Sequence, residues 1–355
     1  MPGICGYGVH LPHYRIKFAD IAESWNRKEA KLPGEKTVPA PDETVLTMAR
    51  NAVFNALQTA DISSSEIDAV YFCSNSSMIE GSLAQDIAIA ADIASDTKTN
   101  VTIADLHGSP RSFTTGIQMC LDALHLERIK YGLIVGSDIL VGGIGTNIGE
   151  PASEYISAAG AGALILGTEG TIADFEAMTS YMTGLKDRWR DLNARFPRIG
   201  EGRFIRDYGY VDHVVKAGKS LLELAERPIN DFQHIVLQQP HAQWYQRALE
   251  KLGISKEALK ERLTAPGFII GKFGDIGAAC LPVALAEVLD NAQPDETILT
   301  VSYGSGGSDA LSWVVRPPIL EKKEKATPVE KFIKNKEYVN YTTMLRYNKV
   351  ISQFV

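Results

Sequence analysis

The fold class is decided by residues 101–136, VTIADLHGSPRSFTTGIQMCLDALHLERIKYGLIVG. Residues 101–106 and 131–136 are short apolar runs of strand length, and residues 110–126 are predicted as a helix. Pro110 falls near the first turn of that helix, where its missing N–H costs little. A strand, a helix and a second strand in this order are typical of an α/β protein.

The same alternation of strands and helices runs along the whole chain. Further strands are predicted at residues 4–11, 67–72, 163–166, 234–237, 268–270 and 297–301, and further helices at residues 42–60, 82–93, 212–225, 243–252 and 278–289. A glycine-rich loop, residues 302–309, follows the last strand. This order predicts a mostly parallel sheet that is covered by helices on both faces.

The two halves of the pattern overlay. The strand at 67–72 matches the strand at 234–237, and the strand at 131–136 matches the strand at 297–301, both at an offset of roughly 165 residues. We interpret this repeat as an internal duplication, with an N-terminal half at residues 1–167 and a C-terminal half at residues 168–355. Ordinary α/β alternation without duplication is the alternative interpretation.

The composition excludes several classes of protein. Of the 355 residues, 45% are hydrophobic and 22% are charged, which is ordinary for a globular protein. The net charge of −7 argues against a nucleic acid as partner. We expect no membrane span and no secretory leader, because neither apolar pattern occurs. Four scattered cysteines without a Cys-x-x-Cys pair predict free thiols in the cytoplasm and no bound metal.

Several segments, in order along nearly the whole chain, carry a resemblance to a known family. They are residues 4–16, 36–43, 129–133, 136–138, 154–155, 159–163, 303–309 and 338–346. In these segments the chain resembles the archaeal and bacterial 3-hydroxy-3-methylglutaryl-CoA synthases of the thiolase superfamily, and it is also similar to ketoacyl synthase III. The resemblance implies an α/β thiolase fold, in which two similar halves with mixed sheets pack as five alternating α-β-α-β-α layers. It also implies at least a dimer, which admits acyl-CoA through a narrow tunnel.

The resemblance further locates the positions of the family's chemistry. A Claisen-type condensation needs a cysteine thiolate at a helix N-terminus, a His and an Asn that hold the thioester oxygen, and a Glu for proton transfer. Counted from their flanking residues, these positions hold Pro110, Gln238, Lys272 and Asn75. Proline offers neither a nucleophile nor an N–H for an oxyanion hole, and losing one such donor costs roughly 10²–10³ in rate. The resemblance therefore implies that no catalytic residue is retained.

Other side chains are candidates for a rebuilt site. Ser109 and Ser112 are candidate acyl acceptors, and His107 and His241 are candidate bases, since a hydroxyl is a poor nucleophile without one. The alternative role of the serines is to cap the helix that starts near Pro110, and that of the histidines is an ordinary hydrogen bond in a loop. The cysteines are expected to be buried thiols, with none at a helix N-terminus aligned with the tunnel: Cys5, Cys73, Cys120 and Cys280.

Four basic residues raise the question of an anionic ligand. Arg111 and Lys272 bring positive charge to the site, and we expect them to pair with a carboxylate of the chain such as Asp275. Arg203 and Arg206 are candidate contacts for the phosphates of coenzyme A, with an ordinary basic loop as the alternative.

Two functions follow from these residues. The first is a non-condensing scaffold subunit of a multi-component thiolase or acyltransferase complex, with no covalent cofactor and a coenzyme A thioester as candidate ligand. Its partners would be a second copy of the chain, or a thiolase and a small zinc-ribbon/OB-fold protein, bound through loops at residues 75–81 and around Gly142. The second is an active acyl-CoA C-acyltransferase with a rebuilt site at Ser109, Ser112 or His241.

Overall fold

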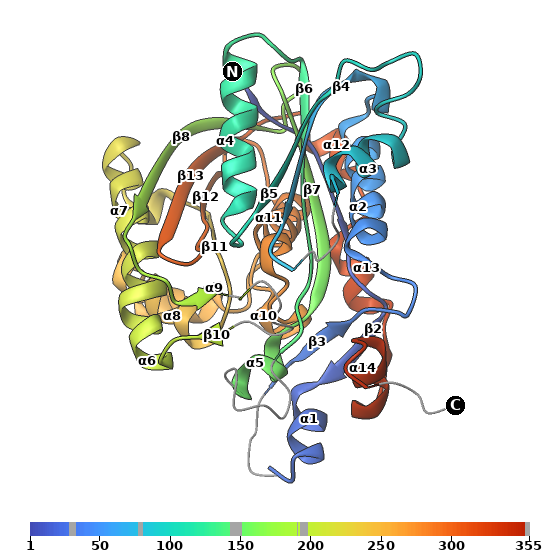
Figure 1. Cartoon of the computed structure of the whole chain (residues 1–355). Helices are drawn as coiled ribbons and strands as arrows, with labels where there is room; N and C mark the ends of the chain where they lie inside the picture. Colours follow the sequence, from blue (N-terminus) through green and yellow to red (C-terminus); the bar gives the residue numbers. More distant parts are fainter. Residues whose placement is uncertain (28–32, 77–80, 143–150, 190, 192–197, 352–355) are drawn as a thin grey trace.

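The computed structural model describes residues 1–27, 33–76, 81–142, 151–189, 191 and 198–351 (Figure 1). Within these residues, nine strands form one mixed sheet. Their order across the sheet is β11 (His234–Leu237), β12 (Thr297–Val301), β13 (Gly307–Val315), β8 (Ala173–Met182), β1 (Gly3–His10), β7 (Ala159–Gly167), β6 (Tyr131–Ile139), β4 (Ile67–Ser74) and β5 (Thr102–His107).

The strand order is nearly symmetrical about the junction of β1 and β8. On one side β5, β4 and β6 are parallel, and β7 and β1 continue antiparallel. On the other side β11 and β12 are parallel, and β13 and β8 continue antiparallel. The junction is short, because β1 and β8 pair through Gly3 with Asp174 and Ile4 with Ala173. A duplication would produce this order, and the boundary at residue 167 stays a prediction.

Helices and strands stack in the five alternating α-β-α-β-α layers that were expected. Figure 1 shows α4 (Ser112–His125) and α11 (Cys280–Asn291) at the centre, with the strands of the two halves on either side. Their apolar residues share one core cluster with side chains from both halves of the sheet. The outer layers are α2 (Val45–Ala60) with α3 (Leu83–Ala90), and α7 (Asp212–Leu224) with α8 (Ala242–Leu252). The turn that carries Pro110 leads into α4, and the turn at Gly277–Ala279 leads into α11.

Sequence pattern explains which helix takes which layer. In α11 every residue from Cys280 to Leu289 is buried, which suits a helix enclosed on all sides. In α2 one apolar face is buried, and the exposed face meets solvent. That helix begins at Val45, three residues after the predicted start, because Thr44 and Thr47 form a reciprocal capping box.

The strand predicted at residues 268–270 is wrong. Ile270 is the first residue of α10 (Ile270–Phe273). The backbone of residues 267–270 forms hydrogen bonds with the side chain of Gln239 and not with a neighbouring strand. The Gln239 side-chain oxygen accepts from the N–H groups of Ile269 (2.8 Å) and Ile270 (3.1 Å), and its amide nitrogen donates to the Gly267 carbonyl (2.6 Å). A buried glutamine thus makes the hydrogen bonds that a strand partner would make.

The C-terminal segment packs on the body of the protein. A small sheet of β14 (Glu337–Tyr338), β2 (Tyr14–Lys17) and β3 (Glu35–Val38) is covered by α1 (Phe18–Ser24) and α14 (Tyr341–Tyr347). Helix α12 (Ile319–Lys325) packs on α2. The remaining elements are α5 (Pro151–Ile156), β9 (Arg188–Trp189), β10 (Arg198–Ile199), α6 (Gly202–Phe204), a π-helix (Ile205–Val211), α9 (Lys256–Arg262), α13 (Val329–Lys334) and three 3₁₀ turns (Ser64–Glu66, Ile229–Asp231 and Gly277–Ala279).

Candidate functional site

The turn that carries Pro110 connects β5 to α4. Strand β5 ends at His107 and α4 begins at Ser112. Between them the Ser112 N–H donates to the Ser109 carbonyl (3.0 Å), and the Phe113 N–H donates to the Pro110 carbonyl (3.4 Å). The helix therefore begins two residues later than predicted, with Pro110 in the preceding turn.

The serines of this turn do not cap α4, contrary to the capping interpretation. Arg111 occupies the N-cap position and makes no side-chain cap bond. The Ser112 hydroxyl is buried and has no hydrogen-bond partner in the described part of the chain. Ser109 packs closely against the glycine-rich loop, where a Cβ on Gly304 would lie 2.4 Å from Ser109 Oγ. Neither contact provides the base that activates a hydroxyl.

Arg111 pairs with a carboxylate of the chain, as predicted, but its partner is Asp309 and not Asp275. Arg111 Nε lies 2.8 Å from Asp309 Oδ2. The hydroxyls of Thr114 (2.6 Å) and Ser180 (2.7 Å) also donate to this carboxylate, which is almost fully buried. The turn before α4 is thereby fixed to the first residues of β13.

Lys272 also pairs with a carboxylate other than the predicted one. Its Nζ lies 2.5 Å from Glu287 Oε1 on α11. Asp275 instead accepts from the Gly277 N–H (3.0 Å) and lies 3.8 Å from Arg188 Nη1. Burial raises the pKa of Asp275, and the charge of Arg188 opposes that shift. Lys272 lies within the short helix α10, whereas Asp275 follows the helix after Gly274, so these neighbours in sequence have different partners.

Gln238 is buried at the end of β11. Its amide nitrogen donates to the Gly277 carbonyl (2.9 Å), and its backbone N–H donates to the Val301 carbonyl (2.8 Å). Its side-chain oxygen is buried and accepts from no described donor. An amide has no basic nitrogen, so Gln238 holds the loop before α11 and offers no proton acceptor comparable to a histidine.

Asn75 lies in a turn that Asp138 organises. Asp138 Oδ1 accepts from the Ser74 hydroxyl (2.8 Å), the Asn75 N–H (2.7 Å), and both the N–H (2.8 Å) and the hydroxyl (2.7 Å) of Ser76. Its other oxygen accepts from the Ala278 N–H (2.7 Å). Burial raises the pKa of Asp138, and these hydrogen bonds oppose the shift.

One network thus brings two of the four family-equivalent positions together. The Gln238 amide donates to the Gly277 carbonyl, and the N–H of the following Ala278 donates to Asp138. The Asp138 carboxylate also accepts from the Asn75 N–H. Gly277 adopts φ +61°, and a Cβ there would lie 2.2 Å from Asp138 Oδ2, so a larger residue does not fit. Asp138 was not among the predicted site residues, although an acid that follows a long apolar strand was a usable signal.

The two histidines have hydrogen bonds typical of loop positions. His107 Nδ1 lies 3.2 Å from the Ser74 carbonyl. His241 is the N-cap of α8, where Nδ1 accepts from the Gln243 N–H (3.2 Å) and the ring stacks on Trp244. Burial lowers the pKa of His241, which favours the neutral ring that this cap requires. Both histidines make an ordinary hydrogen bond, although His107 is the last residue of β5 and does not lie in a loop.

All four cysteines are buried free thiols, as expected. Cys280 nevertheless lies at a helix N-terminus, as the first residue of α11, and its sulfur accepts from the Gln239 N–H (3.3 Å). Cys73 lies beneath the first turn of α4 and donates to the Ser112 carbonyl (3.4 Å). Burial raises the pKa of all four thiols, to about 12 in Cys5.

The two arginines predicted to meet coenzyme A lie in α6 (Arg203) and in the π-helix that follows it (Arg206). Arg206 is bound to Asp207 through two hydrogen bonds (2.9 and 2.7 Å), whereas the Arg203 side chain is exposed. The predicted partner loops lie partly outside the described residues, namely at residues 77–80 and 143–150. Among the described residues, no group of three His, Cys, Asp or Glu could hold a metal, and no helix has the length and apolar composition to cross a bilayer.

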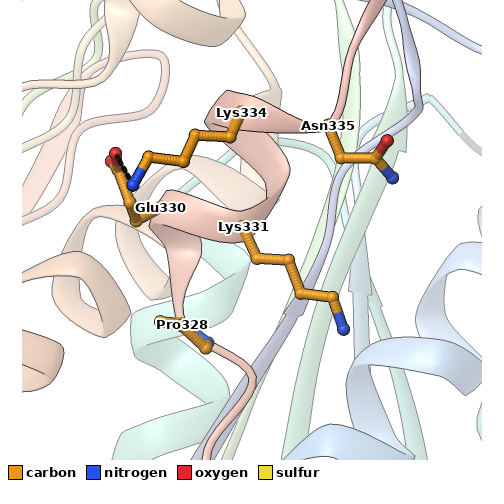
Figure 2. A pocket seen from close by; sticks show the side chains of 5 residues that line it. All are labelled: Pro328, Glu330, Lys331, Lys334 and Asn335. Carbon is orange, nitrogen blue, oxygen red and sulfur yellow. Dashed lines mark ion pairs between the residues drawn. The ribbon is translucent and has the colours of Figure 1, made fainter.

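Two shallow hollows on the surface lie apart from the residues above. The larger, of about 520 Å³, surrounds α13 and is lined by Pro328, Glu330, Lys331, Lys334 and Asn335 (Figure 2). In Figure 2 Lys334 turns back to Glu330, at 3.1 Å, while Lys331 points the other way. The second, of about 460 Å³, is lined by Leu57, Gln58, Asp61, Ile62 and Lys325. Neither hollow includes a predicted site residue.

Comparison with known proteins identifies relatives that match the chain over nearly its whole length. The chain is 38% identical over 357 residues to the hydroxymethylglutaryl-CoA synthase of Methanocaldococcus jannaschii, with 99% of each chain covered. It is 36% identical to that of Methanothermobacter thermautotrophicus, with 98% of each covered. The chain belongs to the hydroxymethylglutaryl-CoA synthase family. No protein-family model matches it.

Solved structures of this family and its neighbours share the thiolase fold. A hydroxymethylglutaryl-CoA synthase complexed with CoA superposes with a TM-score of 0.84 at 18% identity, covering 97% of this chain and 89% of the other. The 3-oxoacyl-[acyl-carrier-protein] synthase III of Aquifex aeolicus superposes with a TM-score of 0.73 at 19% identity, covering 88% and 100%. The chain therefore shares the fold of these two structures.

Proposed function

We propose that this chain is a non-condensing member of its family and serves as a subunit of a multi-component thiolase or acyltransferase complex. The observation that carries the proposal is the state of its thiols. Acyl transfer by the family's route needs a thiolate, and burial raises the pKa of every cysteine in the chain. A thiol kept neutral and away from solvent does not take up an acyl group.

The residues at the other family-equivalent positions support the same proposal. Lys272 is neutralised by Glu287, and Gln238 holds a backbone carbonyl. The alternative, an acyltransferase with a rebuilt site, needs a base next to a serine, but the buried Ser112 hydroxyl has no partner among the described residues and His241 caps α8. Relatives are solved with CoA and with 3-hydroxy-3-methylglutaryl-CoA, so we propose that a coenzyme A thioester, if bound here, is held without a covalent bond.

An acylation experiment tests the proposal. We expect the intact mass of the protein to stay unchanged after incubation with acetyl-CoA. The matched control is Pro110→Cys, which places a thiol at the uncapped N-terminus of α4, where the helix dipole lowers a thiol pKa; this variant should gain one acetyl group. A stable acetyl adduct on the unmodified chain, at cysteine or serine, would support the rebuilt-site alternative instead.

The exposed edge of the sheet supports association with a partner chain. The two outermost strands differ: β11 is buried at Ile235 to Leu237, whereas β5 is exposed at both ends and Ile103 is 39% exposed. Met119 of α4 is also exposed, at 38%. An uncovered apolar edge strand is a template for pairing with another strand. We propose that β5 meets a second copy of the chain, or a thiolase and a small zinc-ribbon/OB-fold protein, in the cytoplasm.

Introducing a charge on this edge is expected to dissociate the assembly. Ile103→Lys should weaken association by about ten-fold or more, because a lysine at an edge opposes strand pairing. Sedimentation velocity over a range of concentrations, with and without the proteins encoded by neighbouring genes, measures this. The control is Ile89→Lys, which changes an equally apolar residue that is 58% exposed on α3. A wild-type chain that stays monomeric and alone would contradict the proposal.

A further inference from the structure

A second surface, at the π-helix, combines exposed aromatic rings with positive charge. Phe204 and Tyr208 are 48% and 65% exposed, and their ring centroids lie 5.1 Å apart. They lie one turn apart at the junction of α6 with the π-helix, beside the exposed Arg203. Large aromatic side chains exposed together are enriched at protein interfaces, and π-helices are frequent at functional sites.

The acids of this surface are already occupied by neighbours in the chain. Glu201 caps α6, where its carboxylate accepts from the N–H groups of Arg203 (3.0 Å) and Phe204 (2.7 Å). Asp207 binds Arg206 through two hydrogen bonds and lies 3.3 Å from Arg247 Nε. These contacts lower the pKa of both carboxyl groups, so both are ionised and already hydrogen-bonded within the chain.

The cations outnumber these acids. Arg206 and Arg203 face Glu201, and Arg206, Arg247 and Lys251 face Asp207, so four positive groups surround two negative ones. The whole chain, in contrast, carries a net charge of −7. Because Arg206 and Arg247 are held in place by Asp207, less conformational entropy is lost when they meet a ligand.

We infer that this surface, formed by Arg203, Phe204, Arg206, Tyr208, Arg247 and Lys251, binds an acidic segment of a partner protein. Charge complementarity selects the occupant: the positive groups repel the same surface on a second copy and attract carboxylates. Both rings are open to solvent, at 48% for Phe204 and 65% for Tyr208. Exposed aromatic rings among positive groups suit a protein partner, because aromatic residues and arginine are enriched at protein interfaces.

A peptide-binding experiment tests the inference. The probe is a short, fluorescein-labelled peptide of alternating glutamate and leucine, and fluorescence anisotropy reports its binding to the full chain. We expect binding that weakens with salt, and that weakens by about ten-fold or more in Arg203→Glu and in the double variant Phe204→Ala with Tyr208→Ala. A peptide of lysine and leucine with the same length should not bind.

Two control variants separate this surface from general electrostatics and stickiness. Lys334→Glu reverses a charge on α13, where the side chain is 74% exposed, and Leu224→Ala removes an apolar side chain that is 59% exposed on α7. Both should bind the glutamate peptide as the wild type does. Absence of binding, equal losses in all variants, or displacement of the peptide by ADP would each overturn the inference.

The inference rests on the proposed function, because a subunit of a complex requires a partner protein. Different experiments nevertheless contradict the two proposals. An acetyl adduct overturns the non-condensing proposal and leaves the peptide result as it is. A peptide that does not bind removes the acidic partner from this surface, while the unchanged mass with acetyl-CoA still stands.

Discussion

Replacing Asp138 by alanine is expected to lower the free energy of unfolding by about 3–5 kcal/mol. The buried carboxylate accepts hydrogen bonds from the backbone N–H groups of Asn75, Ser76 and Ala278, which join the end of β4 to the loop before α11. Alanine leaves these donors without their acceptor, and an unsatisfied buried donor costs about 1–3 kcal/mol. Guanidinium chloride unfolding, followed by circular dichroism, measures the loss.

Two control variants show whether the loss comes from the network. Asp138→Asn keeps one carbonyl oxygen and should lose less stability than Asp138→Ala. Asp61→Ala removes an acid that is 63% exposed and paired with Lys325, so its effect should be small. If Asp138→Ala is no less stable than Asp61→Ala, the carboxylate does not hold the site together.

The stability of the protein is expected to rise between pH 7 and pH 8.5 through Lys36. This side chain is buried, and its Nζ donates to the carbonyls of Glu154 (2.5 Å) and Ser157 (2.9 Å) at the end of α5. Burial lowers the pKa of Lys36 to about 7, with Glu154 opposing the shift. Above that pH the unfolded chain binds one more proton than the folded chain, so the free energy of unfolding increases by about 1.4 kcal/mol per pH unit.

Lys36→Met isolates this contribution, because methionine has no proton to lose. The difference in unfolding free energy between wild type and variant should therefore grow with pH over this window, as measured by urea unfolding. Lys325→Met is the control, since the Asp61 partner raises the pKa of Lys325 and keeps it charged in both states. Equal pH slopes for wild type and Lys36→Met would show that Lys36 stays charged when buried.

Hydrophobic periodicity was sufficient to predict most of the architecture. The strands β11 and β12 have the predicted bounds, and the largely apolar sequence of α11 from Cys280 to Leu289 suits a central helix. The strand β8 escaped prediction because polar and half-buried residues interrupt its pattern, and β13 because it begins inside the glycine-rich segment. The false strand at 268–270 had the right composition, but the side chain of Gln239 took the place of its partner.

The site was harder to predict because its contacts join residues far apart in the chain. Pro110, Gln238, Lys272 and Asn75 were located from their flanking motifs. The flanking residues do not show which residue each side chain contacts. Examples are the ion pairs of Arg111 with Asp309 and of Lys272 with Glu287. A local pattern shows that a charge is present, whereas its partner depends on how the two central helices meet the sheet.

The mass of the unmodified protein after incubation with acetyl-CoA tests the central claim most directly. We predict that native protein shows no added acetyl group, because each thiol is buried and the Ser112 hydroxyl has no hydrogen-bond partner in the described part of the chain. Appearance of one acetyl group, mapped by peptide sequencing to a cysteine or serine of the chain, would contradict this account and assign the protein to the active synthases of its family.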